Sequence, residues 1–242
     1  IYLDCVNGNK DTSKSIGGVP NTTRALSYFG RLTYTYDDRY SLQANFRADA
    51  FDSSKLSSDN RWGHFFSTSA GWTFSNEKFF KDNIDSSIMS FGKLRVSWGQ
   101  NGNVNVLSNY AYIAGIATNG QWYQYGPTNQ VTYGSMPNGI ANPDLTWEKS
   151  EQIDLGLDMR FLDNRLSVGI DWYKKTTKDL LVPAPAMPES GVSTITINAG
   201  EVENSGLEME LTWKDNIGDF KYSISGNFAT LKNKATYLDP SI

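Results

Sequence analysis

Two pairs of carboxylates in this sequence have a spacing that could support chemistry. Asp154 and Asp158 lie four residues apart, and Glu208 and Glu210 lie two apart, so each pair shares a face if its segment is an extended strand. Neighbouring carboxylates can act as general acid and base or bind a cation. Charges are also ordinary on the polar face of a strand, where arginines of adjacent strands neutralise them. We predict this structural role, with three available partners: Arg47, Arg95 and Arg160.

Other residues that commonly carry chemistry lack the neighbours they would need. His64 is the single histidine and has no metal-ligand or triad partner nearby in the sequence. The glycines of residues 99–103 (GQNGN) have no strand–loop–helix context for phosphate binding. Cys5 is the single cysteine, so no disulfide can form within the chain. We therefore predict no catalytic residue, no metal site and no cofactor, and we expect that the protein is not an enzyme.

One aromatic cluster is a candidate for contact with a substrate or partner. Trp122, Tyr123 and Tyr125 lie in a long segment rich in asparagine and glycine. Exposed rings can stack on sugar faces or pack against another protein, and internal packing of the segment is the competing interpretation. The net charge of −4 and the lack of a basic run give no footprint for nucleic acid.

The first carboxylate pair belongs to a predicted β-hairpin. Apolar residues occupy every second position over residues 153–161 and again over residues 166–172. A strict period of two predicts extended strands with one apolar and one polar face. The short connection around residues 163–164 consists of turn formers, so the two arms are antiparallel neighbours. We expect the first arm to begin at Leu145.

The same alternation recurs along the chain and predicts about eight strands in all. The other six cover residues 28–36, 40–48, 66–74, 93–100, 207–213 and 220–228. The short turns are at 37–38, 162–165 and 214–219, and the long irregular connections are at 51–63, 101–144 and 174–200. A short helix capped by Ser75 is expected within residues 75–88. In an up-and-down meander the long connections all lie at one end, which is typical of outer-membrane barrels.

The residues of the strands agree with a membrane setting. Aromatic residues gather near both ends of the apolar ladders, as at the two interfaces of a bilayer. The ladders carry no charge at membrane depth, where one charge would cost about 2–4 kcal/mol. We predict an all-β protein with the fold of an antiparallel, up-and-down transmembrane β-barrel. Two alternatives stay open: a complete eight-stranded barrel with a structural or adhesion role, and a secreted, sugar-binding β-sandwich.

Transmembrane helices are excluded, because the sequence has no run of 18 apolar residues. The chain begins with Ile1 and shows no signal peptide. A barrel protein has to be exported, so we expect this sequence to be an internal piece of a longer one.

Several strings resemble one family in the right order over nearly the whole chain. They are SYFGRLTYTYDDRYSLQANFRAD (27–49), NRWG (60–63), KLRVSWGQNGN (93–103), NPDLTWEKSEQIDLGLD (142–158), and the pattern from DWYKKTTKDLL (171–181) to NAGEVENSGLEMEL (198–211). Together they are similar to the SusC/RagA group of TonB-dependent outer-membrane transporters.

This resemblance implies a barrel of 22 strands with an N-terminal plug, energised by TonB and working with a SusD-like surface lipoprotein. It implies import of glycan oligosaccharides or peptides across the outer membrane of a Gram-negative, Bacteroidota-like bacterium. Residues 1–242 would then be part of the barrel domain, in contact with outer-membrane lipid. The plug domain and the TonB-contacting segment would be absent from this sequence.

Overall fold

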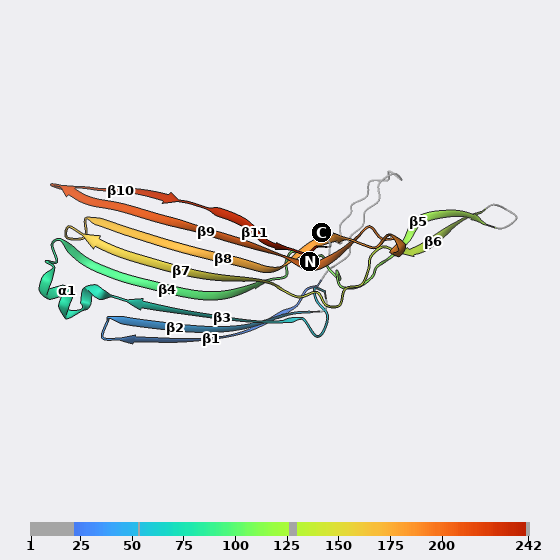
Figure 1. Cartoon of the computed structure of the whole chain (residues 1–242), viewed down its shortest axis with the longest axis horizontal. Helices are drawn as coiled ribbons and strands as arrows, with labels where there is room; N and C mark the ends of the chain where they lie inside the picture. Colours follow the sequence, from blue (N-terminus) through green and yellow to red (C-terminus); the bar gives the residue numbers. More distant parts are fainter. Residues whose placement is uncertain (1–21, 53, 126–129, 241–242) are drawn as a thin grey trace, which may run out of the picture.

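The chain folds as one long, curved antiparallel sheet with a separate hairpin beyond one end (Figure 1). In this computed structural model, residues 22–52, 54–125 and 130–240 are described, residues 118–133 as backbone only. The strands are β1 (Ala25–Tyr36), β2 (Tyr40–Phe51), β3 (Trp62–Trp72), β4 (Met89–Asn103), β5 (Ile116–Tyr125), β6 (Gln130–Pro137), β7 (Glu148–Phe161), β8 (Leu166–Pro185), β9 (Thr194–Ile217), β10 (Phe220–Ala229) and β11 (Lys232–Leu238). The short helices are η1 (Phe74–Asn76), α1 (Lys78–Asn83) and η2 (Pro188–Ser190). Within these ranges, no helix has the length and apolarity needed to cross a membrane.

From β1 to β10, strands that neighbour each other in the sheet also follow each other in the chain, apart from the inserted β5–β6 hairpin. The order is β1-β2-β3-β4-β7-β8-β9-β10, with antiparallel pairs throughout. These are the eight strands expected from the alternation, so the predicted up-and-down meander is confirmed. Because β1 and β10 lie at opposite edges and do not pair in the described sheet, the alternative of a closed eight-stranded barrel is wrong.

The two faces of the sheet differ in chemistry, and the apolar face is exposed. On β7, Ile153 and Leu155 are 44% and 46% exposed, and Trp172 on β8 is 42% exposed. The register of β7 with β8 is unbroken, so the alternation of apolar and polar residues places each kind on its own face. A β-sandwich would bury the apolar face against a second sheet. The sandwich alternative is therefore wrong.

The exposed apolar residues form a band of limited height. Along β7 the band runs from Ile153 to Phe161, roughly 27 Å at the usual rise of a strand. A tilt of about 35–45° reduces this to roughly 20 Å along the membrane normal, close to the ~25 Å band of outer-membrane barrels. Directly beyond it on the same face, Glu151 accepts a hydrogen bond from Gln100 at 2.8 Å and pairs with Lys178 at 3.2 Å. The band thus ends where charged side chains begin.

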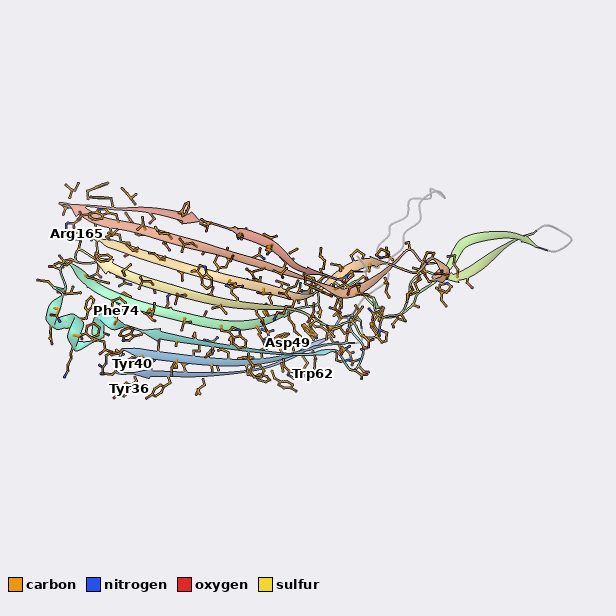
Figure 2. The ribbon with its side chains drawn as sticks, viewed as in Figure 1. Tyr36, Tyr40, Asp49, Trp62, Phe74 and Arg165 are labelled. Carbon is orange, nitrogen blue, oxygen red and sulfur yellow. The ribbon has the colours of Figure 1, made fainter. Side chains whose placement is uncertain are left out.

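Aromatic residues lie near both ends of the sheet (Figure 2). Tyr36, Tyr40 and Phe74 lie at the end with the short turns, and Trp62 lies at the end with the long connections. Trp62 stacks on Tyr28 of the edge strand β1, with ring centroids 6.2 Å apart. Tyr36, Tyr40 and Phe74 match the predicted belt at the short-turn end, and Trp62 adds an aromatic ring at the other end.

Beyond the apolar band, β8 and β9 continue as a long extension. Pro185, the last residue of β8, pairs with Thr194, the first residue of β9. The prediction of an irregular loop over residues 174–200 is therefore wrong, and the connection itself covers residues 186–193. The alternation stops here because Leu180, Leu181 and Val182 are consecutive apolar residues, and the register with β9 shifts on both sides of Leu180. The prolines fit because β7 does not accompany β8 beyond Lys178, which leaves β8 an edge strand on that side.

The segment over residues 101–144, predicted to be irregular, holds the end of β4 and the β5–β6 hairpin, so that prediction is also wrong. Three connections then meet at the base of the hairpin and, together with Phe65 of β3, form a small buried core. Its members are Leu56, Phe65, Val104, Leu107, Leu145 and Trp147. Leu145 is fully buried, and β7 begins only at Glu148. The predicted start of the first arm at Leu145 is wrong, because this leucine packs into the core of the connections.

At the short-turn end, the connection from β3 to β4 holds η1 and α1. The expected helix is present, but Glu77 and not Ser75 occupies its N-cap position. The Glu77 carboxylate accepts hydrogen bonds from Tyr40 Oη (2.6 Å), Trp72 Nε1 (3.1 Å) and Arg39 Nη1 (2.8 Å). These bonds, that of Tyr40 above all, hold the pKa of Glu77 below its usual value. The carboxylate thereby ties the β1–β2 turn to the next connection.

The alternation did not predict β11, which continues the edge of the sheet along β9. Between β10 and β11 the chain bends, and Thr230 N donates to Leu207 O at 2.8 Å. A Cβ atom at Gly206 would overlap the Thr230 carbonyl oxygen. Glycine at this position therefore lets the bent edge strand stay close to β9.

Candidate functional site

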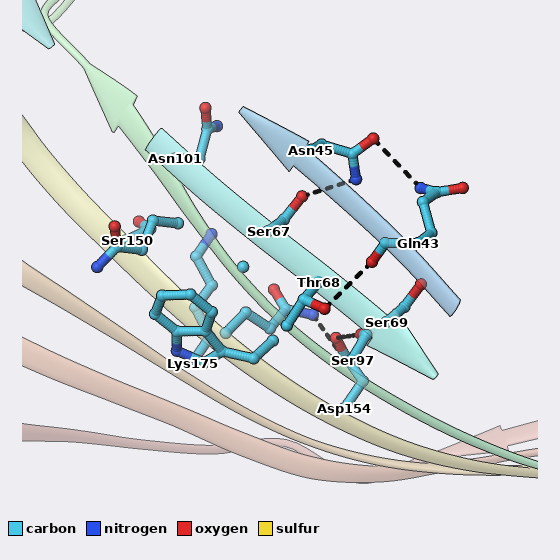
Figure 3. A pocket seen from close by; sticks show the side chains of 14 residues that line it. Gln43, Asn45, Ser67, Thr68, Ser69, Ser97, Asn101, Ser150, Asp154 and Lys175 are labelled. Atoms are coloured by element: carbon cyan, nitrogen blue, oxygen red, sulfur yellow. Dashed lines mark hydrogen bonds between the residues drawn. The ribbon is translucent and has the colours of Figure 1, made fainter. Parts of the chain in front are cut away.

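The polar face carries a shallow hollow where β2, β3, β4 and β7 run side by side (Figure 3). Its volume is about 440 Å³. Residues of all four strands line it, among them Gln43, Asn45, Ser67, Ser97, Gln152 and Asp154. The hollow therefore offers amide and hydroxyl groups and one carboxylate, all of which can exchange hydrogen bonds with a polar solute.

The side chains in the hollow already hold one another in place. Asn45 Nδ2 donates to Ser67 Oγ at 3.0 Å. Ser97 Oγ donates to one oxygen of Asp154 at 3.0 Å, and Gln152 Nε2 donates to the other at 2.8 Å. Each bond joins neighbouring strands or successive inward positions of one strand, so the polar groups keep fixed directions without a ligand.

Strand register brings these residues together. Ser97 on β4 lies opposite Ser69 on β3 and opposite Asp154 on β7. Asn45 on β2 likewise lies opposite Ser67 on β3. Because polar residues recur every second position, the rows place them all on one face. The three serines have short side chains, which leaves the space of the hollow.

An ion cluster lies on the same face, nearer the short turns. Arg95 Nε is 2.6 Å from Asp158 Oδ2, and Arg95 Nη2 is 3.0 Å from Asp171 Oδ1. Gly156 on β7 lies opposite both Arg95 on β4 and Asp171 on β8. A Cβ atom at Gly156 would overlap the Asp171 carboxylate and lie 2.7 Å from Arg95 Cζ. Arg95, one of the three arginines expected to neutralise the carboxylates, thus pairs with Asp158, and Asp171 joins the pair.

The hollow and the ion cluster form one continuous polar track. A second hollow of about 240 Å³ reaches Arg95 and shares Ser69, Ser97 and Asp154 with the first. Lys175 lines the first hollow and forms no ion pair within the described part of the chain. In the same described ranges, no cluster of histidine, cysteine and carboxylate side chains could hold a metal ion. The track is thus equipped for hydrogen bonding along the sheet.

The three aromatic residues predicted for substrate or partner contact lie elsewhere. They belong to β5, in the hairpin beyond the end of the sheet (Figure 1). In the backbone register, Trp122 lies opposite Tyr133, Tyr123 opposite Thr132, and Tyr125 opposite Gln130. Their side chains lie outside the described residues, so their role stays a prediction.

His64 packs among aromatic rings. On the apolar face of β3 its ring stacks with those of Phe46 and Trp62, at centroid distances of 6.1 Å and 6.5 Å. Cys5 lies outside the described residues.

The other two arginines that were predicted to neutralise the carboxylate pairs contact other side chains. Arg47 pairs with Asp49 on its own strand, Nε to Oδ2 at 2.6 Å. The Arg160 guanidinium lies 5.1 Å from the centre of the Phe91 ring. Neither glutamate of the second predicted carboxylate pair forms an ion pair within the described ranges.

Sequence reasoning identified the polar positions but missed the hollow that they form. The sequence feature that could have revealed the hollow is the occurrence of serine at polar positions of two adjacent strands, at Ser67, Ser69 and Ser97. To use it, one has to know the register of β3 with β4, and the alternation alone leaves that register open.

An exposed apolar band with aromatic residues at both ends, opposite a hydrogen-bonded polar face, defines the wall of a membrane β-barrel. Comparison with known families agrees with this class. Residues 4–241 match the family described as TonB dependent receptor-like, beta-barrel, and the chain belongs to this family.

The relatives in sequence are TonB-dependent receptors. The chain is 36% identical to TonB-dependent receptor P3 of Formosa agariphila over 219 residues, which are 90% of the chain and 21% of the relative. It is also 36% identical to TonB-dependent receptor SusC of Bacteroides thetaiotaomicron over 216 residues, which are 88% of the chain and 21% of SusC. The chain thus spans about a fifth of the length of these relatives. Receptors of this family are outer-membrane proteins.

A solved structure has the same arrangement of strands. The RagAB peptide importer in its open-open state superimposes with a TM-score of 0.78 and 29% identity, over 91% of this chain and 23% of the importer chain. The siderophore receptor PirA of Pseudomonas aeruginosa, at 14% identity and a TM-score of 0.51, shares the fold. The open sheet described above is therefore a partial barrel wall of the TonB-dependent type.

Proposed function

We propose that the protein imports large polar nutrients, glycan oligosaccharides or peptides, across the bacterial outer membrane in a TonB-dependent manner. Residues 1–242 are then part of its barrel domain and supply wall and extracellular loops. The plug domain and the TonB-contacting segment belong to the rest of the protein. A SusD-like surface lipoprotein is the partner on the extracellular side.

The observation that carries this proposal is the opposite chemistry of the two faces of one sheet. The apolar face is exposed over the height of a membrane, while the polar face holds a track of hydrogen-bonding groups. A solute that moved along the polar face would exchange hydrogen bonds with water for hydrogen bonds with the wall. The names of the relatives support the same conclusion, since one is SusC and another is a peptide importer.

The β5–β6 hairpin supports a contact with substrate or partner at the long-loop end. It projects beyond the sheet, and it carries Trp122, Tyr123 and Tyr125. Replacement of all three by alanine in the full-length protein should weaken uptake or lipoprotein docking. If both stay at the wild-type level, these residues are not a contact site.

Uptake by cells that express the full-length protein tests the proposed function. Ser69 and Ser97 lie opposite each other in the hollow, and Ala70 and Val96 lie opposite each other on the apolar face. Tryptophan at both serines should lower the uptake of labelled oligosaccharides or peptides severalfold, because the bulky rings fill the track. Tryptophan at Ala70 and Val96 is the matched control and should leave uptake unchanged.

Two outcomes of this experiment would overturn the proposed function. One is wild-type uptake that is independent of TonB. The other is equal uptake by the two double variants.

A further inference from the structure

Three lysines lie on the apolar side of the sheet, one at the edge of the apolar band and two just beyond it. Lys149 on β7 is directly opposite Lys178 on β8, and Lys174 lies four residues nearer the band. The register of β7 with β8 is continuous from the short turn to this pair. Because alternation is kept over that length, these three lysines share the face of Ile153 and Trp172.

Like charges directly opposite each other in a β-ladder destabilise the pair unless something neutralises them. Lys178 has a partner, since its Nζ is 3.2 Å from Glu151 Oε2. Glu151 also accepts a hydrogen bond from Gln100. Lys149 is exposed and forms no ion pair within the described residues. The opposed lysines therefore have one shared carboxylate for two positive charges.

Positive charge also exceeds negative charge on the part of this face that lies nearer the apolar band. Lys174 pairs with Glu203 at 2.8 Å. On the same face, Lys232 and Lys234 of β11 lie opposite Ser205 and Glu203 of β9, so five lysines are accompanied by three glutamates, Glu151, Glu201 and Glu203. This local excess of positive charge contrasts with the net charge of −4 of the whole chain. A bound anionic group would neutralise the remaining positive charge at Lys149 and Lys178.

The distance of the lysines from the apolar band indicates which kind of anion they could bind. Lys149 lies four residues beyond Ile153, the last apolar residue of the ladder on β7. Four residues correspond to about 14 Å along a strand and to roughly 10 Å along the normal at the usual tilt. If the apolar band faces lipid, as the proposed function requires, the amines reach the level of lipid headgroups.

We propose that Lys149 and Lys178 bind the phosphate of an anionic membrane lipid from the outer side of the barrel wall. Lys174, at the edge of the band, adds a third amine below this site. Each amine contributes by attraction to the phosphate and by hydrogen bonds to its oxygens.

Lipid retention by the purified full-length protein tests this site. The protein is placed in nanodiscs of phosphatidylcholine that contain a small share of phosphatidylglycerol, and bound lipid is counted by native mass spectrometry after release. The double variant Lys149→Gln with Lys178→Gln should lose phosphatidylglycerol, by roughly fivefold for each lysine removed. Lys149→Arg with Lys178→Arg keeps both charges and should retain it.

Lys175→Gln is the matched control, because Lys175 follows Lys174 on β8 but points to the polar face. It should leave retention unchanged. Equal retention by the wild type, the glutamine double variant and the Lys175 variant would overturn the site. Displacement of bound phosphatidylglycerol by millimolar inorganic phosphate would overturn the lipid as ligand and leave a site for free phosphate.

This test separates the lipid site from the proposed function. If lipid retention follows the lysines but uptake does not depend on TonB, the site stands and the import function fails. If uptake is TonB-dependent but retention ignores the lysines, only the lipid site fails.

Discussion

Arg95 and Asp171 form an ion pair across an intervening strand. They belong to β4 and β8, which are separated by β7, yet Arg95 Nη2 is 3.0 Å from Asp171 Oδ1. The contact is possible because Gly156 of β7 lies opposite both residues and has no side chain to block the guanidinium. One arginine therefore links three strands of the polar face.

Gly156→Ala should break this link. The added methyl group would overlap the Asp171 carboxylate, so Arg95 has to withdraw from it. Half-exposed ion pairs are weak and alanine suits a strand better than glycine, so we expect a net loss of only about 1 kcal/mol. The measurement is the midpoint of thermal unfolding of the full-length protein in detergent.

Gly169→Ala is the control for this prediction. Gly169 lies on the same polar face of β8, and its nearest neighbour to an added Cβ is at an ordinary 3.9 Å. This variant should keep or slightly raise the midpoint. An equal drop in both variants would contradict the role assigned to Gly156.

Leu145→Ala should loosen the connections at the long-loop end. Leu145 is fully buried against Trp147 and the connections that follow β2 and β4. Loss of a buried leucine side chain costs about 2–5 kcal/mol. The variant should be cleaved faster by protease within residues 104–115, as mapped by mass spectrometry. Val106→Ala, at a position 56% exposed, should be cleaved like the wild type.

Acidification should weaken the short-turn end through Glu77. The pKa of this carboxyl is lowered by the hydrogen bonds of Tyr40, Trp72 and Arg39. A carboxyl with a lowered pKa contributes stability that is fully present above its unfolded value and is lost as pH falls through its folded value. Between about pH 5 and pH 3, the thermal midpoint of the wild type should therefore fall more steeply than that of Glu77→Gln.

Tyr40→Phe gives a second measurement on the same group. It removes the largest cause of the lowered pKa, so the acid-induced loss should be smaller than in the wild type and complete at a higher pH. If Glu77→Gln and the wild type lose stability in parallel, Glu77 is not responsible.

The sequence predicted the membrane-spanning part of the sheet well, for a physical reason. Between Ile153 and Phe161, for example, one face meets lipid and the other meets polar groups, so every second residue must be apolar. The extension beyond Lys178 was taken for a loop because Leu180, Leu181 and Val182 are consecutive apolar residues followed by prolines, so the alternation that marks a strand disappears. Leu145 was placed on the strand because an apolar residue before an alternating segment looks the same whether it faces lipid or a buried core.

The candidate site was predictable only in part. That an arginine of an adjacent strand would neutralise a carboxylate such as Asp158 followed from the opposite charges on the polar ladders, but not which arginine it would be. The part played by Asp171 did not follow either, because it depends on the register that sets Gly156 between the two strands. Prediction of the hollow would also have required the strand register, since Ser69, Ser97 and Asp154 are far apart in the chain.

The central claim is that the two faces of β7 meet lipid and water. It can be measured with spin labels on single cysteines of the full-length protein in bilayers, after Cys5→Ser. Labels at Leu155 and Leu157 should collide with dissolved oxygen more than with a polar nickel complex. Labels at Asp154 and Asp158 should show the reverse. Equal accessibility at all four positions, or the opposite order, would contradict the account.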